Sequence, residues 1–533
     1  MVSIKKKILI ALALLVIFYI TLSYEFTGTF ICNIFKPDFY FVPGNIYKVL
    51  FSFAVVLCVA IFGLLLNSKY LRNNHLLNLL FTEKSFLIFM ICSGFIISVL
   101  VPLYQIPDEP THISLIYEEL GLNASFSTYF GQFNEPIDYI HNQDLKIDAL
   151  TYFTNETLLS IPSISAPVSV AIVKHFPQAI GLVICSIFHC SIFVTSVVCE
   201  SFAVLFSSFI CYIALRLIPS RKLLFASLMA LPLCIQQNGS FSYDAVLVPT
   251  CFLLFAYLMN IKFVKKDFNT KDLLLILMMV IIIAIIKIPY VLIGSIIFLI
   301  PSKKFSFKFF NFKLDYKNWI KYKRILLPVL ILLGAVLIFT IFITARGNSF
   351  VNLLITSFVC FPKTFVLIVK FLIFDVLRIW KTHLWDFGWL NIPPSVYYLL
   401  FIIASIFIFN FLNNDNSQKL KLGIGECLFI LIIFILSFYV ICVSMIEHTL
   451  FLQNINISSL SLGDLISNYN NVGQILGLQG RYFIPILPLL CYSLKSEKLS
   501  KLFRYINYKL YAATYFSVVF FYIDFIMVTR YWI

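Results

Sequence analysis

The chain has 533 residues, of which 61% are hydrophobic and only 12% are charged. Soluble domains carry about 25% charged residues, so this composition excludes a set of soluble domains and indicates a polytopic membrane protein. The formal net charge of +15 does not indicate nucleic-acid binding, because the Lys and Arg residues cluster in short segments between apolar runs. The 13 Cys residues lie mostly inside apolar runs and include no CxxC pair, which predicts buried thiols rather than disulfides or a metal site.

Three apolar runs open the chain, at residues 8–22, 46–66 and 86–104. Lys5, Lys6 and Lys7 precede the first run, which we interpret as a retained span because no small-residue cleavage site follows it. Basic residues favour the cytoplasmic side, so the amino terminus is expected inside and the polar stretch after the third run outside.

That polar stretch, residues 105–120 (QIPDEPTHISLIYEEL), holds the first cluster of ionisable groups. Ionisable groups at a membrane boundary are costly and usually functional. A helix starting at Asp108 would place His112 four residues from Asp108 and three from Glu109, near both on one face. The alternative is helix capping, since Asp108 is a good N-cap and Glu109 suits the positive end of a helix. The apolar residues at the spacing of an amphipathic helix are Ile113, Ile116, Tyr117 and Leu120.

Further apolar runs follow an acidic, lysine-poor outer loop that ends near residue 175. Of the runs 176–193 and 196–217, one is expected to lie in the membrane interface, because the basic residues after them belong inside. The next predicted crossings are 223–235, 245–259, 273–286 and 290–300. A full span needs about 20 residues, so the run 290–300 is predicted to be tilted, re-entrant or packed inside protein.

In the carboxyl-terminal half, apolar runs continue to alternate with polar segments after a basic inner segment, 303–324. Run 325–344 leads to an outer segment, 346–394, where basic and Trp residues interleave with apolar ones, as in a surface-lying amphipathic helix. Arg378, Lys381 and His383 in this segment fit a stripe that faces lipid head groups, and they are third-rank candidates for binding an anionic group. The remaining predicted crossings are 396–412, 427–443, 484–494 and 510–528, with an outer loop at 447–481.

These runs predict an all-α integral membrane protein with about 13 transmembrane helices, 11–13 being the expected range, and amphipathic helices on the outer face. We divide the chain into N-terminal spans (1–85), a membrane core (86–494) with outer loops 105–175, 346–394 and 447–481, and a basic segment with a last span (495–533). The sequence contains no Walker A motif and no GxGxxG after a strand.

Four local motifs carry a resemblance to a known family. They are PDEPTH (107–112), SFSYDAVLVP (240–249), FGWLNIPPSVY (387–397) and QGRYFIPILPLL (479–490). In this order they resemble a widespread family of predicted bacterial membrane proteins with a PDExxH motif, of formerly unknown function, which is grouped with the GT-C superfamily of polytopic glycosyltransferases. The chain departs from the family at Ile113, where an aromatic residue is common, and at Phe176, where a Tyr usually precedes the Pro.

The resemblance implies a GT-C-like fold and an inverting glycosyltransferase. Such an enzyme moves a sugar from a polyprenyl-phosphate donor to a hydroxyl of a cell-surface glycan or lipid, at the outer face of the bacterial plasma (inner) membrane. It implies a lipid bilayer as surroundings, no nucleic acid and no cofactor. The alternative function is a lipid-linked oligosaccharide flippase or transporter, and a polymerase or ligase that joins lipid-linked glycans uses similar parts.

Glycosyl transfer from a lipid phosphate needs a base for the acceptor hydroxyl and a cation for the departing phosphate. The resemblance implies an acidic residue in the first outer loop, which makes Asp108 the first candidate base and Glu109 the second. Arg481 is the first candidate for the phosphate, because a guanidinium binds phosphate in bidentate fashion, and Lys287 is the second. The alternatives are an arginine that snorkels from a helix end and a lysine that marks the interface.

Four more residues are candidates for binding or orienting the substrate: His112, Tyr243, Asp244 and Tyr482. Asp244 has the alternative of a simple N-cap. His112 could instead bind a divalent ion with Asp108 and Glu109, but no HxxxH or HxxH spacing supports this, so no metal is expected.

Overall fold

The fold is taken from a computed structural model, which describes residues 82–101, 106, 108–120, 170–188, 190, 192–306, 308–309, 312–313, 349–375, 396–412, 422–457, 460–494, 496–503 and 508–531. The first two predicted spans, the predicted crossing 325–344, and Arg378, Lys381 and His383 lie outside the described residues.

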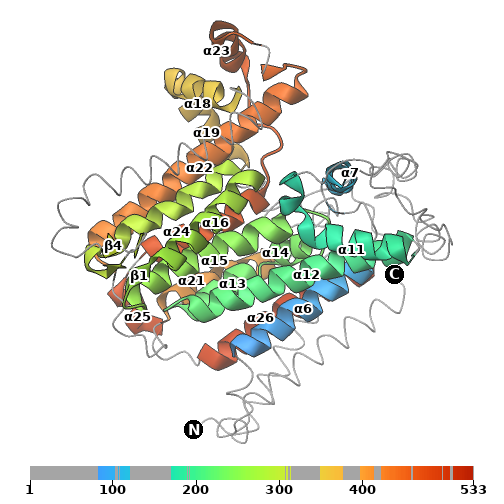
Figure 1. The fold of residues 1–533 in the computed structure, drawn as a ribbon, viewed down its shortest axis with the longest axis vertical. Helices are drawn as coiled ribbons and strands as arrows, with labels where there is room; N and C mark the ends of the chain where they lie inside the picture. Colours follow the sequence, from blue (N-terminus) through green and yellow to red (C-terminus); the bar gives the residue numbers. More distant parts are fainter. Residues whose placement is uncertain are drawn as a thin grey trace, which may run out of the picture.

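Helices dominate the part of the chain that the structure describes (Figure 1), in agreement with the predicted all-α class. Its strands form only two pairs of two-residue segments. β1 (Phe268–Asn269) pairs in parallel with β2 (Phe305–Ser306), and β3 (Lys308–Phe309) pairs antiparallel with β4 (Phe312–Lys313). These strands connect helix ends and do not build a layer of their own.

The centre of the fold is a bundle around α12 (Ile192–Leu217), which packs against α6 (Glu83–Leu100), α11 (Phe176–Ile187) and α15 (Asp244–Phe263). Figure 1 shows α6, α12 and α15 side by side. Small residues allow this approach, because Gly94 of α6 and Gly181 of α11 face α12 so closely that a Cβ atom would lie under 3 Å from its side chain or backbone. Helix packing therefore brings the chain before residue 108 against the middle of the sequence.

Three helices are long and apolar enough to cross a membrane: residues Val194–Leu217 of α12, α15, and α22 (Ile424–Leu452). α18 (Ser349–Val359) and α19 (Phe361–Lys370) would make a fourth span as a pair, but they are bent by 94° at their junction. The described residues thus contain three to four candidate spans, fewer than the about 13 predicted, some of which lie outside them. The 12-residue α11 agrees with the expectation that one of the runs 176–193 and 196–217 does not cross.

Two predicted crossings are broken at prolines. The run 223–235 forms α13 (Lys222–Met229) and α14 (Pro232–Asn238) instead of one helix, because Pro232 offers no N–H to the preceding turn and begins a new helix. α14 extends past this run through the helical residues 236–238. Likewise, the run 484–494 comprises the 3₁₀-helix η8 (Gly480–Ile486) and α24 (Leu487–Ser493).

The short crossing predicted at 290–300 is the 3₁₀-helix η3 (Ile288–Leu299). A 3₁₀-helix rises about 2.0 Å per residue, so its 12 residues extend about 24 Å, more than an α-helix of the same length. Tyr290, Ile293 and Ile296 recur every three residues and are buried. η3 packs against α15, α16 (Thr270–Ile286) and α22, in agreement with the prediction of a segment packed inside the protein.

The rest of the described chain surrounds this bundle. α22 continues to Leu452, so the loop predicted from residue 447 begins later, and Figure 1 shows α22 reaching α18, α19 and α23 (Leu462–Asn471) at one end of the molecule. α19 buries Thr364 and Leu367, and Thr364 bonds to Tyr469 of α23 (Oγ1 to Oη, 2.8 Å). The remaining elements are α7 (Glu109–Glu119), η2 (Val170–Lys174), η4 (Ser302–Lys304), the π-helical η5 (Phe371–Asp375), α21 (Val396–Phe411), α25 (Glu497–Leu502) and α26 (Tyr508–Tyr531).

Candidate functional site

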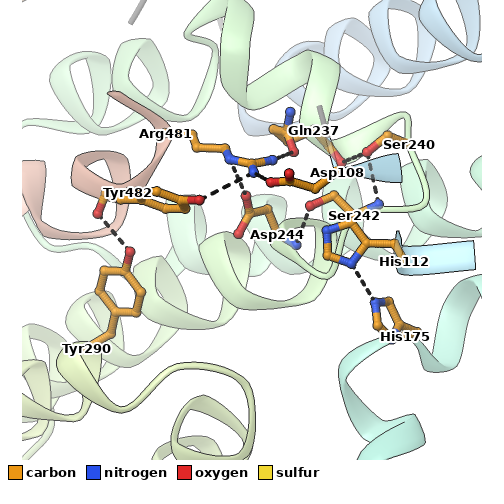
Figure 2. Close-up of polar contacts among 10 residues, drawn as sticks. All are labelled: Asp108, His112, His175, Gln237, Ser240, Ser242, Asp244, Tyr290, Arg481 and Tyr482. Carbon is orange, nitrogen blue, oxygen red and sulfur yellow. Dashed lines mark hydrogen bonds and ion pairs between the residues drawn. The ribbon is translucent and has the colours of Figure 1, made fainter. Parts of the chain in front are cut away.

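Arg481 is the centre of the polar cluster in Figure 2. It lies in η8 and is only 4% exposed, yet it carries a full charge. Its Nη1 donates to Oε1 of Gln237 (3.0 Å), its Nη2 forms an ion pair with the carboxylate of Asp108, and its Nε lies 3.8 Å from Oδ2 of Asp244. Opposite charges offset the cost of burying a guanidinium. Residues from the turn before α7, the start of α15 and η8 therefore meet at one buried cation.

The two carboxylates at Arg481 differ in their surroundings. Asp108 directly precedes α7, has a positive φ of 67°, and its side chain is 47% exposed. Its carbonyl accepts the first helical hydrogen bond, from His112 N (3.0 Å), but its carboxylate pairs with Arg481. Asp244 opens α15 and is buried, and its N–H donates to Oγ of Ser242 (3.2 Å). One carboxylate is thus fixed inside the protein, and the other lies at the surface.

Lys287 supplies a second cation beside Arg481. It caps the end of α16, and its Nζ lies 3.5 Å from the centre of the Tyr482 ring. The guanidinium of Arg481 lies 5.3 Å from the same ring centre, and Tyr290 Oη fixes this turn by donating to the Tyr482 carbonyl (2.8 Å). Lys287 Nζ also lies 5.7 Å from the ring centre of Tyr243. Aromatic faces attract cations, so these tyrosines hold both positive groups together.

Behind this cluster His112 begins a chain of buried polar groups. Its Nδ1 lies 3.1 Å from Nε2 of His175, whose Nδ1 lies 3.2 Å from Oε2 of Glu119, and Lys174 Nζ lies 2.8 Å from Oε1 of Glu119. Burial and the neighbouring His175 lower the pKa of His112 well below its usual value, and burial lowers the pKa of His175. Burial opposes the charge of Glu119, but hydrogen bonds from His175 and Lys174 outweigh it and lower the pKa of this carboxyl. The chain thus consists of two neutral imidazoles and a carboxylate.

Glu109 points to a third set of partners. It is 1% exposed, its Oε1 accepts from Phe241 N (3.5 Å), and its carboxyl hydrogen-bonds to that of Glu200 in α12. Asp108, Glu109 and His112 therefore reach three different partners, although they lie within five residues.

A family model matches residues 87–490, most of the chain. The chain belongs to the family "Predicted membrane protein (DUF2142)". No curated protein and no solved structure matches it. The matched range begins in α6 and ends in α24, so it includes every residue of the cluster.

All eight predicted site residues of this DUF2142 protein lie in the described part of the chain. Arg481 bonds Asp108 and contacts Asp244 and Tyr482. Lys287 and His112 join through Tyr243, whose ring packs edge-on against His112 at 4.7 Å between centres, whereas Glu109 faces Phe241 and Glu200 instead. The burial of Arg481 rules out an arginine that snorkels to the interface. Lys287 is both a helix-end lysine and part of the cluster. Among the described residues no group of three His, Cys, Asp or Glu is arranged to hold a metal ion.

Several residues of the cluster were not predicted from the sequence: Glu119, His175, Glu200 and Gln237. Glu119 follows His112 by seven residues, which is two helical turns and places both on one face of α7. Gln237 belongs to a run of three amides, residues 236–238, next to an apolar run. Both signals were present in the DUF2142 sequence, but neither identifies a partner without the fold.

Proposed function

We propose that this protein is an inverting GT-C-type glycosyltransferase, which moves a sugar from a polyprenyl-phosphate donor to a hydroxyl of a cell-surface glycan or lipid. The observation that supports it is the pairing of two cations, Arg481 and Lys287, around the Tyr482 ring, next to an exposed carboxylate. This reaction requires cations that bind the donor phosphate and a base that accepts the acceptor's proton, both at one place.

In the proposed reaction, the acceptor oxygen forms a bond to the sugar C1 while the bond from C1 to the phosphate oxygen breaks. The phosphate leaves with the bonding electrons, and its growing negative charge is stabilised by Arg481 and Lys287. Arg481 suits this task because Gln237 already orients its guanidinium at Nη1. The acceptor proton passes to a carboxylate, for which Asp108 is our first choice and Glu109 our second.

Asp108 is free to act as a base only when it leaves Arg481. Its side chain is 47% exposed and precedes a helix, whereas Asp244 is buried at the start of α15. A donor phosphate that binds Arg481 would therefore replace Asp108 and leave Asp244 and Gln237 in place. The freed carboxylate would then lie next to the reacting sugar, so donor binding itself would activate the base.

We place the cluster at the outer face of the bacterial inner membrane, with the amino terminus in the cytoplasm, about 13 spans and no cofactor. The contacts of the basic segments support this sidedness. Lys262 and Glu426 form an ion pair, and Lys304 Nζ donates to the carbonyl of Lys265 (2.6 Å), so the predicted inner segment 303–324 begins beside the basic end of α15. α15 runs from Asp244 at the cluster to Lys262 at this basic end.

The test is transfer in vitro from a defined polyprenyl-phosphate sugar by the purified full-length protein in lipid. We expect Asp108→Asn to lower turnover by about 100-fold or more, as for loss of a general base. Arg481→Lys is expected to lower it by a similar factor through loss of phosphate stabilisation. The exposed Arg216, given the same change, serves as the control and should retain activity. Full turnover in Asp108→Asn would remove the proposed base, and no transfer by the wild type with any donor would reject the function.

Glu200 favours a second candidate, a proton-coupled flippase of lipid-linked glycans. Ionisable groups inside spans often move protons in transporters, and Glu200 lies within the candidate span Val194–Leu217, bonded to Glu109. Movement of a labelled lipid-linked oligosaccharide across proteoliposomes, driven by a proton gradient and lost in Glu200→Gln, would favour this function. Transfer that persists in Glu200→Gln would favour the enzyme.

A further inference from the structure

The chain from His112 through His175 to Glu119 has no part in the transfer steps above. All three side chains are buried, at 3%, 0% and 5% exposure. Their contacts are continuous, with 3.1 Å between the two imidazoles and 3.2 Å between His175 and Glu119, and Lys174 holds the other carboxylate oxygen. Buried polar groups in an unbroken hydrogen-bonded chain are held in one arrangement.

The carboxylate at the end of this chain determines where the protons lie. Glu119 is ionised and only accepts, so Nδ1 of His175 must donate to it. Neutral His175 then keeps a lone pair on Nε2, and Nδ1 of His112 must donate to that atom. Neutral His112 is left with an unprotonated Nε2. Each imidazole therefore carries its proton on Nδ1, an assignment that follows from the partners.

Nε2 of His112 lies on the far side of the ring from Nδ1 and from His175. Figure 2 shows His112 between His175 and the turn of Ser242 and Asp244, which agrees with its edge-on contact to Tyr243. The Tyr243 ring is in turn 5.7 Å from Lys287 Nζ. Among the described residues Nε2 has no hydrogen-bond partner. A fixed acceptor atom thus lies on one side of the Tyr243 ring, and the Lys287 cation lies near the same ring.

We propose that Nε2 of His112 accepts a hydrogen bond from a hydroxyl of the donor's sugar, and that His175 and Glu119 are positioning residues that hold it in the accepting tautomer. This assignment rests on the proposed function. The chemistry of the cluster calls for such an atom. Arg481 and Lys287 only donate, the Asp244 carboxylate stays paired with Arg481, and the displaced Asp108 is the base for the acceptor hydroxyl. The charged groups that act on His112 are Arg481, Lys287 and Lys174, and all three cations disfavour an imidazolium.

The first test measures the tautomers without any substrate. In the full-length protein with ¹⁵N-labelled histidine, with signals assigned by His112→Gln and His175→Gln, we expect both residues to carry the proton on Nδ1. In the Glu119→Gln variant the side-chain amide can either donate or accept a hydrogen bond, so His175 and His112 should show a mixture of tautomers. A wild-type His112 with its proton on Nε2 would overturn the proposal.

The second test isolates the sugar by comparing the affinity for a polyprenyl-phosphate sugar with that for the bare polyprenyl phosphate. A glutamine amide reaches the position of Nε2, whereas an asparagine amide reaches only that of Nδ1. His112→Asn should weaken binding of the sugar-bearing lipid by about 3- to 10-fold, the effect of one neutral hydrogen bond, and His112→Gln less. Binding of the bare lipid should stay the same. Equal losses of affinity for both lipids, or no loss for either, would overturn the proposal. Neither result depends on turnover, so failure of this proposal is distinguishable from failure of the proposed transferase function.

Discussion

Arg481 shows how one residue combines stability with a capacity for binding. Burial opposes its charge, but Tyr482 and the carboxylates of Asp244 and Asp108 keep the pKa of Arg481 above its ordinary value. The buried Asp244 and the exposed Asp108 cannot be equivalent partners, because only the exposed carboxylate regains full hydration when it leaves. An anion from outside would therefore replace Asp108 at lower cost than Asp244.

This difference predicts opposite effects of two similar substitutions on phosphate binding. Asp108→Asn removes the anion that competes for Arg481, so the dissociation constant of a bare polyprenyl phosphate should fall by about 3- to 10-fold, as expected for a partly exposed ion pair. Asp244→Asn leaves the buried guanidinium with less compensation and should lower thermal stability. Affinity measured in detergent micelles, with the thermal unfolding midpoint alongside, checks both. Weaker lipid binding by Asp108→Asn would argue against displacement.

Individual elements were predictable where hydrophobic runs are uninterrupted. The run 273–286 appears as α16 and the run 510–528 as part of α26, because long apolar stretches specify helices in any apolar surroundings. The break in front of Pro232 was missed although the proline itself marks it, and the 3₁₀ geometry of η3 was missed because it depends on packing against neighbours. The pairing of Asp108 with Arg481 joins residues 373 positions apart, a distance at which spacing carries no information. That cluster was anticipated only through the motifs at 107–112 and 479–490.

The close packing of α6 against α12 predicts that one substitution compensates for the destabilisation caused by another. A Cβ added to Gly94 would lie 2.6 Å from Cγ1 of Val204, so Gly94→Ala should separate α6 from α12 and destabilise the protein by about 1–3 kcal/mol. Val204→Ala removes the conflicting methyl groups and should restore most of this loss in the double variant. Gly181→Ala meets the backbone Cα of Cys199 at 2.7 Å, which no side-chain change can relieve.

Unfolding midpoints of these variants in the same detergent provide the measurement. Val204→Ala alone is the control for the cavity that it creates. A Gly94→Ala variant as stable as the wild type would show that α6 and α12 do not pack this closely.

At the scale of the whole molecule, two polar regions hold the bundle at different ends of its helices. One is the cluster around Arg481, and the other joins basic residues to distant carbonyls and amides. Arg221, at the start of α13, donates to Oδ1 of Asn410 (2.9 Å) and to the carbonyl of Cys491 (3.0 Å), which ties α21 and α24 to α13. The first of these regions contains the titratable chain, so its protonation should affect the stability of the entire fold.

Stability should therefore fall as the pH is lowered from neutral. The pKa values of His112 and His175 are lower in the folded protein than the usual value of about 6.5. Below pH 6.5 the unfolded chain binds protons that the folded protein does not, so the free energy of unfolding decreases as the pH falls. The contribution is fully present above 6.5 and is lost toward the folded pKa values. Glu119, whose pKa is lowered from 4.5, adds a second loss of stability below that pH.

The measurement is the unfolding midpoint in lipid nanodiscs between pH 8 and 5. In the wild type the midpoint should decrease as the pH falls below 6.5, and in the double variant His112→Gln, His175→Gln it should decrease less. A midpoint that is constant or rises toward pH 5 would show that these imidazoles are charged in the folded protein, and would contradict the proton arrangement on which the accepting role of His112 depends.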